Sequence, residues 1–378
     1  MKQLRQKKMH ALRSAPGGQD GFSLIELMIA SVIGLVILGG AVTIFTSNSA
    51  SSKMTTGMTR IQDSGRVALD IISYSARMTG YDGCRDEIKE SAVVIASDPP
   101  TINMPDNALW GSEVGTGNTW APAVHPDLAA AISNRVRANT DVFYVQHGSG
   151  RSETLAADMT DPSGDIVLPG NPDQIGVNDM LMISNCELTE IFRATGVSDV
   201  GGNTVIEHST AANDRGNFNT TYTGVGDKDT VPVRVMRFES KAYFVGDSGR
   251  TTPQGATIFS LFSLDTTVDG AEPTELVEGV ENLQVLYGEN IQPGADTPLI
   301  RYVTADNITN AANVFSVQLG LLIATADYAA SSDDGRSYNI AGTNIGPPAD
   351  ASANDNHAGD RRMRAAFNTT IQLRNRTL

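Results

Sequence analysis

The chain has 378 residues, with 43 acidic against 28 basic side chains and a formal net charge of -15 at pH 7. A nucleic-acid-binding surface needs clustered lysine and arginine to displace counterions, so this balance argues against that class of protein. It is typical of a soluble part that faces the periplasm or the cell exterior.

A basic leader comes first, and a membrane-length apolar run follows it. Residues 1–20 contain Lys2, Arg5, Lys7, Lys8 and Arg13 against the single acid Asp20. Residues 21–45 read GFSLIELMIASVIGLVILGGAVTIF, which exceeds the ~20 apolar residues needed to span a bilayer. No small-residue cleavage site follows the run, as it would in a secretory signal. We therefore expect 22–45 to be a retained transmembrane helix. The positive-inside bias places the leader in the cytoplasm and residues 46–378 across the membrane.

One carboxylate, Glu26, lies within this apolar run. An intramembrane acid is costly and is normally paired, so its presence indicates a function. The alternative is a lone glutamate that snorkels to the membrane surface near the end of an ordinary signal anchor.

Helical periodicity continues beyond the membrane, and it predicts an amphipathic helix over 46–80. No proline occurs between residues 22 and 98, so nothing of that kind breaks the helix. One face is expected to hold residues spaced by three and four positions. These are Met54, Met58, Ile61, Gly65, Ala68 and Ile72.

Residues 81–378 predict a mostly antiparallel β head, so the fold class is α+β, with one long helix that carries the head. Runs rich in Val, Ile, Phe, Tyr and Thr indicate strands. They are 142–145, 180–184, 231–245, 258–264, 283–287, 315–325 and 366–373. Three stretches predict loops, 97–127, 209–230 and 329–360, and the last is expected to be a flexible insertion, with a partner-binding loop as the alternative. The head could be one domain or two.

Two cysteines occur in the chain, Cys84 and Cys186. Both lie in the part expected outside the cytoplasm, where disulfides persist. A bridge between them would close a loop of ~100 residues, for which the chain-entropy estimate is ~4.7 kcal/mol. Two free buried thiols are the alternative.

No catalytic or metal-binding pattern stands out, so we expect no enzyme activity, no cofactor and no bound metal. The five histidines are scattered, and neither a phosphate loop nor a Gly-x-Ser-x-Gly turn occurs. Asp333-Asp334-Gly335 and Asp227-Lys228-Asp229 do not complete a calcium loop and are expected to be solvated turns. Arg362 and Arg364 fall on one face of the last strand, and we expect a solvated edge there, with a contact to an acidic neighbouring subunit as the alternative.

The order Gly21, Phe22, three residues, Glu26, apolar helix resembles the type III signal of type IV pilins and type II secretion pseudopilins. The resemblance implies that a prepilin peptidase cuts between Gly21 and Phe22, which removes residues 1–21 as the leader, and methylates the new amine of Phe22. It also implies that Glu26 pairs with such an amine between neighbouring subunits and sets their register, since an opposite charge favours the ionised carboxylate.

Further segments resemble PilW-type minor pilins. They are RVALD at 66–70, RMTGYDGC at 77–84, NDMLMISNC at 178–186, LVEGVENLQVLYG at 276–288 and the end of the chain from 367 to 376. The resemblance implies a structural subunit that joins other minor pilins and the major pilin, primes pilus assembly and helps present a large tip adhesin. Its expected location is the inner membrane and then the pilus tip. The alternatives are a J-class pseudopilin of a type II secretion system and, more weakly, a membrane-anchored periplasmic enzyme or binding protein.

Overall fold

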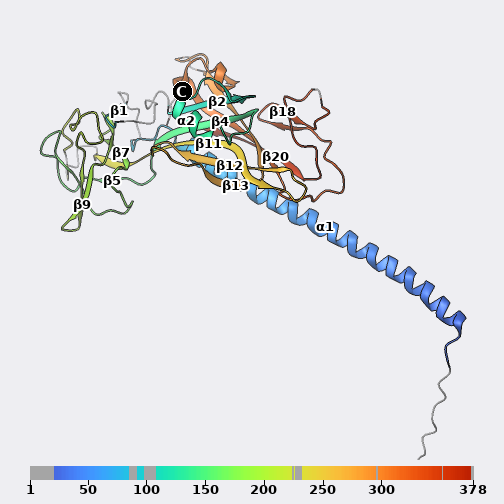
Figure 1. Ribbon diagram of the computed structural model, residues 1–378. Helices are drawn as coiled ribbons and strands as arrows, with labels where there is room; N and C mark the ends of the chain where they lie inside the picture. Colours follow the sequence, from blue (N-terminus) through green and yellow to red (C-terminus); the bar gives the residue numbers. More distant parts are fainter. Residues whose placement is uncertain are drawn as a thin grey trace, which may run out of the picture. The chain divides into compact units, whose positions relative to one another are not determined.

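The computed structural model describes residues 21–84, 92–97, 108–223, 225, 232–294, 297–350 and 352–375. The leader 1–20 and the turn at 227–229 lie outside these ranges. The chain divides into two compact units, residues 1–52 and 53–378, and each is described by itself. The second unit, called the head below, holds all the strands (Figure 1).

One helix, α1, runs from Leu24 to Met78. It begins after Ser23, whose carbonyl accepts the N–H of Leu27 at 3.0 Å. It ends where Gly80 takes a positive φ of 74°, a usual helix C-terminus. The amide of Asn375 donates to the carbonyls of Arg77, Met78 and Thr79 at 3.2–3.3 Å, which satisfies acceptors that the helix end leaves free.

The head contains a ten-stranded sheet in the order β1-β8-β7-β11-β4-β2-β3, with β5, β12 and β13 joined beside this path. Its members are β1 Val93–Val94, β2 Leu109–Gly115, β3 Thr119–Ala121, β4 Thr140–Gly148, β5 Glu153–Thr154, β7 Met180–Ser184, β8 Thr189–Arg193, β11 Arg234–Thr251, β12 Thr257–Asp265 and β13 Thr274–Glu278. The long strand β11 pairs with β7 through its first residues and with β4 and β12 further on. It therefore links the two ends of the sheet.

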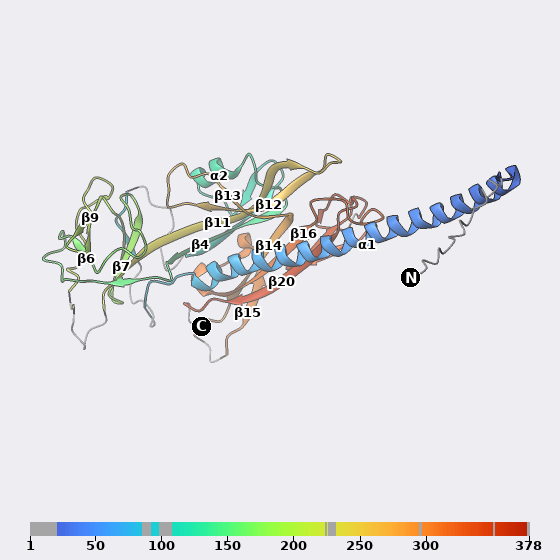
Figure 2. The ribbon, with the colours of Figure 1, turned by 90° about the horizontal axis from the view of Figure 1, so that it is seen from below.

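A four-stranded antiparallel sheet, β15-β14-β16-β20, completes the main core. Its strands are β14 Val280–Asn290, β15 Ile300–Val303, β16 Val314–Ala324 and β20 Arg364–Gln372. Buried side chains of α1, including Ile61 and Ile72, pack with residues of both sheets, such as Phe143 and Leu319. Figure 2 shows β16 and β20 alongside the light-blue part of α1.

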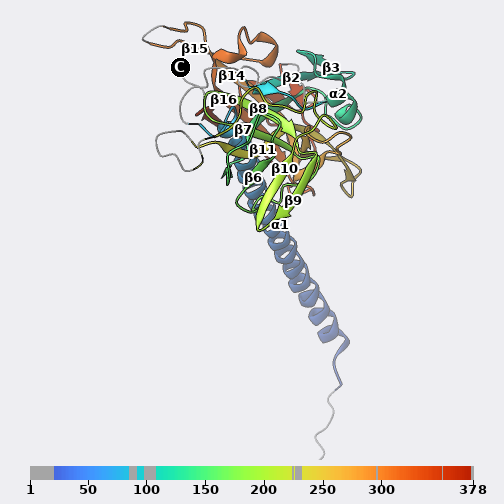
Figure 3. The ribbon, with the colours of Figure 1, turned by 90° about the vertical axis from the view of Figure 1, so that its left-hand side faces the viewer.

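A smaller sheet, β6-β10-β9, forms a lobe with its own apolar cluster. Its strands are β6 Ile166–Leu168, β9 Gly196–Val200 and β10 Asn203–Glu207, and they lie together in Figure 3. The lobe core includes Phe192, Phe218 and Tyr222. The buried side chain of Glu190 accepts from the backbone N–H of Asn219 and from the Tyr222 hydroxyl, and it pairs with Arg215 at 3.2 Å. This carboxylate therefore ties the segment 215–222 to β8.

The α+β prediction is confirmed, as is the mostly antiparallel arrangement. All seven predicted strands are present, as parts of β4, β7, β11, β12, β14, β16 and β20. Several short elements were not predicted from the sequence, among them the helix α2 Pro126–Ile132 and the 3₁₀ turns η1 Ala305–Asn307 and η2 Ala311–Asn313.

Two loop predictions are wrong. The stretch 97–127 contains β2 and β3, which lack the long apolar run of a central strand. The stretch 329–360 contains a small three-stranded sheet of β17 Tyr338–Ile340, β18 Thr343–Gly346 and β19 Asp355–Asn356. The sequence did not indicate this sheet because its strands are poor in apolar residues, and polar contacts, described below, hold it in place. Among its described residues, the stretch 209–230 has no helix or strand.

Candidate functional site

The amino-terminal motif lies at the start of α1. Gly21 and Phe22 precede the helix, and the Phe22 side chain is 89% exposed. The backbone N–H of Ser23 donates to the Glu26 carboxylate at 3.3 Å. This is one half of a capping box, in which a glutamate three residues into a helix accepts from the residue before the helix. The pattern Ser-x-x-Glu was visible in the sequence, yet this local role of Glu26 was not predicted.

The first 22 residues of α1, which belong to the unit 1–52, expose their large apolar side chains, from Leu24 at 77% to Phe45 at 74%. By length and composition, α1 is the one helix among the described residues that could cross a membrane. The hydroxyls of Ser31 and Thr43 donate to carbonyls four residues earlier, at 2.7 and 2.9 Å. Polar groups of the span are therefore satisfied within the helix, as a hydrocarbon environment requires.

The head-bound part of α1 buries a stripe of small and branched residues, Gly57, Ile61, Gly65, Ala68, Ile72 and Ala76. A Cβ on Gly65 would lie 2.5 Å from the Phe367 ring of β20, and one on Gly57 would lie 3.1 Å from Thr325. The predicted face is correct from Ile61 onward. It is wrong for Met54 and Met58, which are 51% and 38% exposed. The helix approaches Thr325 closely at Gly57 instead, so both methionines lie beside this contact and not in it.

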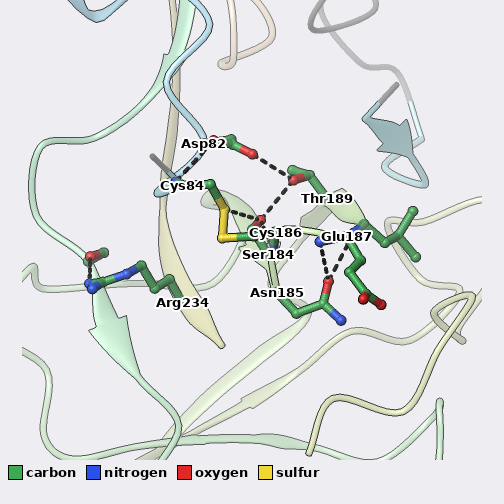
Figure 4. The surroundings of a disulfide bond; sticks show 10 residues. Asp82, Cys84, Ser184, Asn185, Cys186, Glu187, Thr189 and Arg234 are labelled. Carbon is green, nitrogen blue, oxygen red and sulfur yellow. Dashed lines mark hydrogen bonds between the residues drawn. A yellow bond between two sulfur atoms is a disulfide. The ribbon is translucent and has the colours of Figure 1, made fainter. Parts of the chain in front are cut away.

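The structure joins Cys84 and Cys186 in a disulfide, with their Cα atoms 5.5 Å apart (Figure 4). The bridge connects the exit of α1 with the turn between β7 and β8. Asp82, buried next to it, accepts from the Cys84 N–H at 3.1 Å and from the Thr189 hydroxyl at 3.2 Å. Burial raises the pKa of Asp82 despite these hydrogen bonds.

The arginines near the chain end are not a solvated edge, contrary to the prediction. Arg362 and Arg364 are 3% and 2% exposed. Arg364 donates to Glu281 at 2.7 and 3.2 Å and to Asp360 at 2.7 Å. Arg362 contacts the same two acids at 2.9 and 2.8 Å. The two arginines do share a face of β20 and its approach. This face points at Asp360, a near neighbour in the sequence, and at Glu281, which lies 83 positions before Arg364.

Asp334 belongs to the same buried cluster, so the prediction of a solvated turn is wrong for this residue, whereas Asp333 and Gly335 beside it are exposed. Its carboxylate accepts from the Tyr338 hydroxyl at 2.8 Å and from Arg336 at 3.0 Å, and it lies 3.5 Å from Arg364. We call Glu281, Asp334, Asp360, Arg362 and Arg364 the arginine cluster. It ties the segment 333–360 to β14 and β20, which explains why this segment is folded.

The arginine cluster keeps its carboxylates ionised. Burial alone would raise the pKa of Glu281, but Arg364 and Arg362 outweigh it and lower that pKa. The pKa of Asp360 is lowered in the same way, with Arg364 as the main opposing influence to burial. The Tyr338 and Arg336 hydrogen bonds lower the pKa of Asp334 against its own burial.

No arrangement for metal binding occurs within the described ranges, where no three His, Cys, Asp or Glu side chains converge on one point. The buried histidines of the head make structural hydrogen bonds instead. His208 and His357 contact the carbonyls of Gly164 and Arg336 at 2.9 and 2.8 Å.

Comparisons with known proteins match two parts of the chain. Residues 17–42 match the Prokaryotic N-terminal methylation motif, and residues 242–375 match the family model of Type IV Pilus-assembly protein W. The two matches are those of a PilW-type pilin with a prepilin signal. Neither the curated proteins nor the solved structures gave a match.

The PilW match covers several of the residues on which α1 rests, although Phe143 of β4 lies before it. Thr325, Phe367 and Asn375 lie within it, as does the whole arginine cluster. The lobe formed by β6, β9 and β10 lies outside it. The PilW-type segment therefore includes the four-stranded sheet that packs against α1, whereas β2 and β4, which also contribute to this core, lie before it.

Proposed function

We propose that this chain is a minor subunit of a type IV pilus. A prepilin peptidase cuts it between Gly21 and Phe22 and methylates Phe22, and residues 22–45 anchor it in the inner membrane with the head in the periplasm. It then joins other minor pilins and the major pilin, primes assembly and helps present a tip adhesin at the cell surface.

The observation that carries this proposal is the combination of the methylation motif at 17–42 with an exposed apolar helix that begins at Leu24. Gly21 and Phe22 lie before the first helical turn, where the peptide bond is not held in the helix. The apolar window of this helix is unburied among the described residues, and such a helix needs lipid before assembly and other helices after it.

The second candidate is a J-class pseudopilin of a type II secretion system, which would use the same signal. The match to the PilW model over 242–375 favours the pilus. Genes for other minor pilins and an adhesin beside this one would support the pilus, whereas genes for a secretion channel would support the alternative.

The role of Glu26 is tested by two variants that separate its charge from its capping bond. Glu26→Gln keeps an oxygen for the Ser23 N–H but removes the charge, whereas Glu26→Ala removes both. If the charge pairs with the Phe22 amine of a neighbour, both variants are cut normally and both are depleted from sheared pili. Glu187→Gln, an exposed glutamate in the turn after β7, serves as the control.

Wild-type amounts of Glu26→Gln in sheared pili would contradict the register role and leave capping as the function of this glutamate. Absence of the wild-type chain from sheared pili, with normal piliation in its deletion strain, would contradict the proposed function as a whole.

A further inference from the structure

Two carboxyl groups face each other at the joint between the two large sheets. Glu113 of β2 and Asp141 of β4 are directly opposed in the antiparallel pairing. Asp141 is 3% exposed, and directly opposed residues of an antiparallel pair have their side chains on the same face of the sheet, with Cβ atoms about 5 Å apart. Like charges directly opposite in a sheet are destabilising, so this pairing needs a specific explanation.

Both carboxyl groups also bond across the joint. Asp141 accepts the backbone N–H of Val285 in β14 at 2.7 Å, and Glu113 accepts the N–H of Ala305 in η1 at 3.3 Å. The two strands of the ten-stranded sheet are therefore fastened to the four-stranded sheet and its following turn by these two groups.

The neighbours of the pair offer no compensating charge. The negative charge of Asp306 in η1 raises the pKa of both carboxyl groups, and the Tyr287 side chain of β14 lies close to them. Within the described ranges no ion pair joins either carboxyl to a lysine, arginine or histidine. A buried and a half-buried carboxyl group on the same face of adjacent strands, without a cation, cannot both ionise cheaply.

Tyr287 closes the joint on one side. Its hydroxyl lies over Gly111, two residues before Glu113, where a Cβ would be only 1.8 Å from the hydroxyl oxygen. The hydroxyl donates to the Trp110 carbonyl at 3.5 Å. Tyr287 is 1% exposed, so water has little access to the pair from this side.

We propose that Glu113 and Asp141 form a proton-dependent latch, which fastens the four-stranded sheet and η1 to the ten-stranded sheet while one of the two carboxyl groups holds a proton and loosens when that proton is lost. The latch does not depend on the proposed pilus function.

The direction of the pH dependence follows from the shifted groups. Burial is the main cause that raises the pKa of Asp141 and of Glu113, and their mutual repulsion adds to it for Asp141. A group whose folded pKa exceeds its unfolded value stabilises the folded state below the unfolded pKa, and this stability is lost as the pH rises through the folded pKa. The latch is therefore closed in acid and loosens toward alkaline pH.

Hydrogen exchange of the full chain in detergent micelles tests the latch directly. Peptides that contain Val285 and Ala305 are followed between pH 5 and 9 by mass spectrometry, and each rate is divided by its intrinsic chemical rate. In wild type we expect this corrected exchange rate to rise with pH, by about tenfold for each unit by which the pair's pKa is raised. We call this rise the residual increase. Peptides of β9 and β10 should show no such increase.

Glu113→Gln keeps the oxygen for Ala305 and can donate to Asp141, so the residual increase should disappear in this variant. Glu187→Gln, with the same change of charge at an exposed site, should behave as wild type. Asp141→Asn is the second variant if Glu113→Gln does not fold, with the same expected result. A wild-type rate with no residual increase, or an equal increase in the folded variant, would overturn the latch.

Discussion

The arginine cluster allows a quantitative prediction, because Arg364 is fully buried as a side chain and holds two acids at once. Arg364→Met keeps most of the side-chain volume but removes the guanidinium. Loss of one partner from a buried ion pair costs about 3–5 kcal/mol, since the other charge stays buried. Arg362 still contacts Glu281 and Asp360 at 2.9 and 2.8 Å, so we expect the lower end, about 3 kcal/mol.

The assay is thermal or urea unfolding of the full chain in detergent. At ~2.1 cal/mol/K per residue, the unfolding entropy of residues 53–378 is roughly 0.7 kcal/mol/K, so a loss of 3 kcal/mol lowers Tm by about 4 °C. The matched control is Arg361→Met, which lies between Asp360 and Arg362 in the chain but has an exposed side chain outside the cluster. Arg361 is 55% exposed as a side chain and pairs with Asp333 at 3.6 Å, so its removal should cost at most about 1 kcal/mol.

A double-mutant cycle with Glu281→Leu separates pairing from packing. Replacing a buried ion pair by apolar groups of similar volume is often neutral, so the double variant should lose less stability than the sum of the single losses. An additive double variant, or a loss for Arg364→Met no larger than for Arg361→Met, would refute the reasoning.

Three further predictions concern the same head. Gly65→Val should destabilise by about 1–3 kcal/mol through overpacking against Phe367, with partial rescue by Phe367→Ala and no comparable loss for the exposed control Gln62→Val; full stability of Gly65→Val would contradict the packing. Replacing Cys84 and Cys186 together by Ala should lower the free energy of unfolding by up to ~4.7 kcal/mol in the absence of reductant, and the difference from wild type should vanish when reductant is added. The pKa values of Glu281, Asp334 and Asp360 are lowered in the folded chain, so these groups stabilise the fold at pH values above their unfolded pKa values. The free energy of unfolding should therefore fall below about pH 4, and it should fall less steeply in Arg364→Met. An equal slope in wild type and variant would count against the arginine cluster as the source.

The main strands could be predicted from sequence because they are long, β-branched and bounded by turn residues, as in β16 and β14. The short strands could not. β17, β18 and β19 have few apolar residues, and their position depends on Arg364 and Asp334, which meet only in the folded chain. Local patterns do not reveal such long-range polar pairing.

Which face of a strand points into the protein is the second feature that the sequence could not predict. Alternation placed Arg362 and Arg364 on one side of a strand correctly, but whether this side is inside depends on Glu281, 83 positions before Arg364. In the amino-terminal motif, by contrast, all the signals are local, so Gly21, Phe22 and Glu26 could be named from the sequence. Their cleavage, methylation and pairing remain predictions.

The most direct test of the proposed function is mass spectrometry of the amino terminus of the chain purified from membranes of its native host. The pilin account predicts a terminus at Phe22 that carries one methyl group, and loss of this product when Gly21 is changed to a bulky residue. An intact chain that begins at Met1 would contradict it.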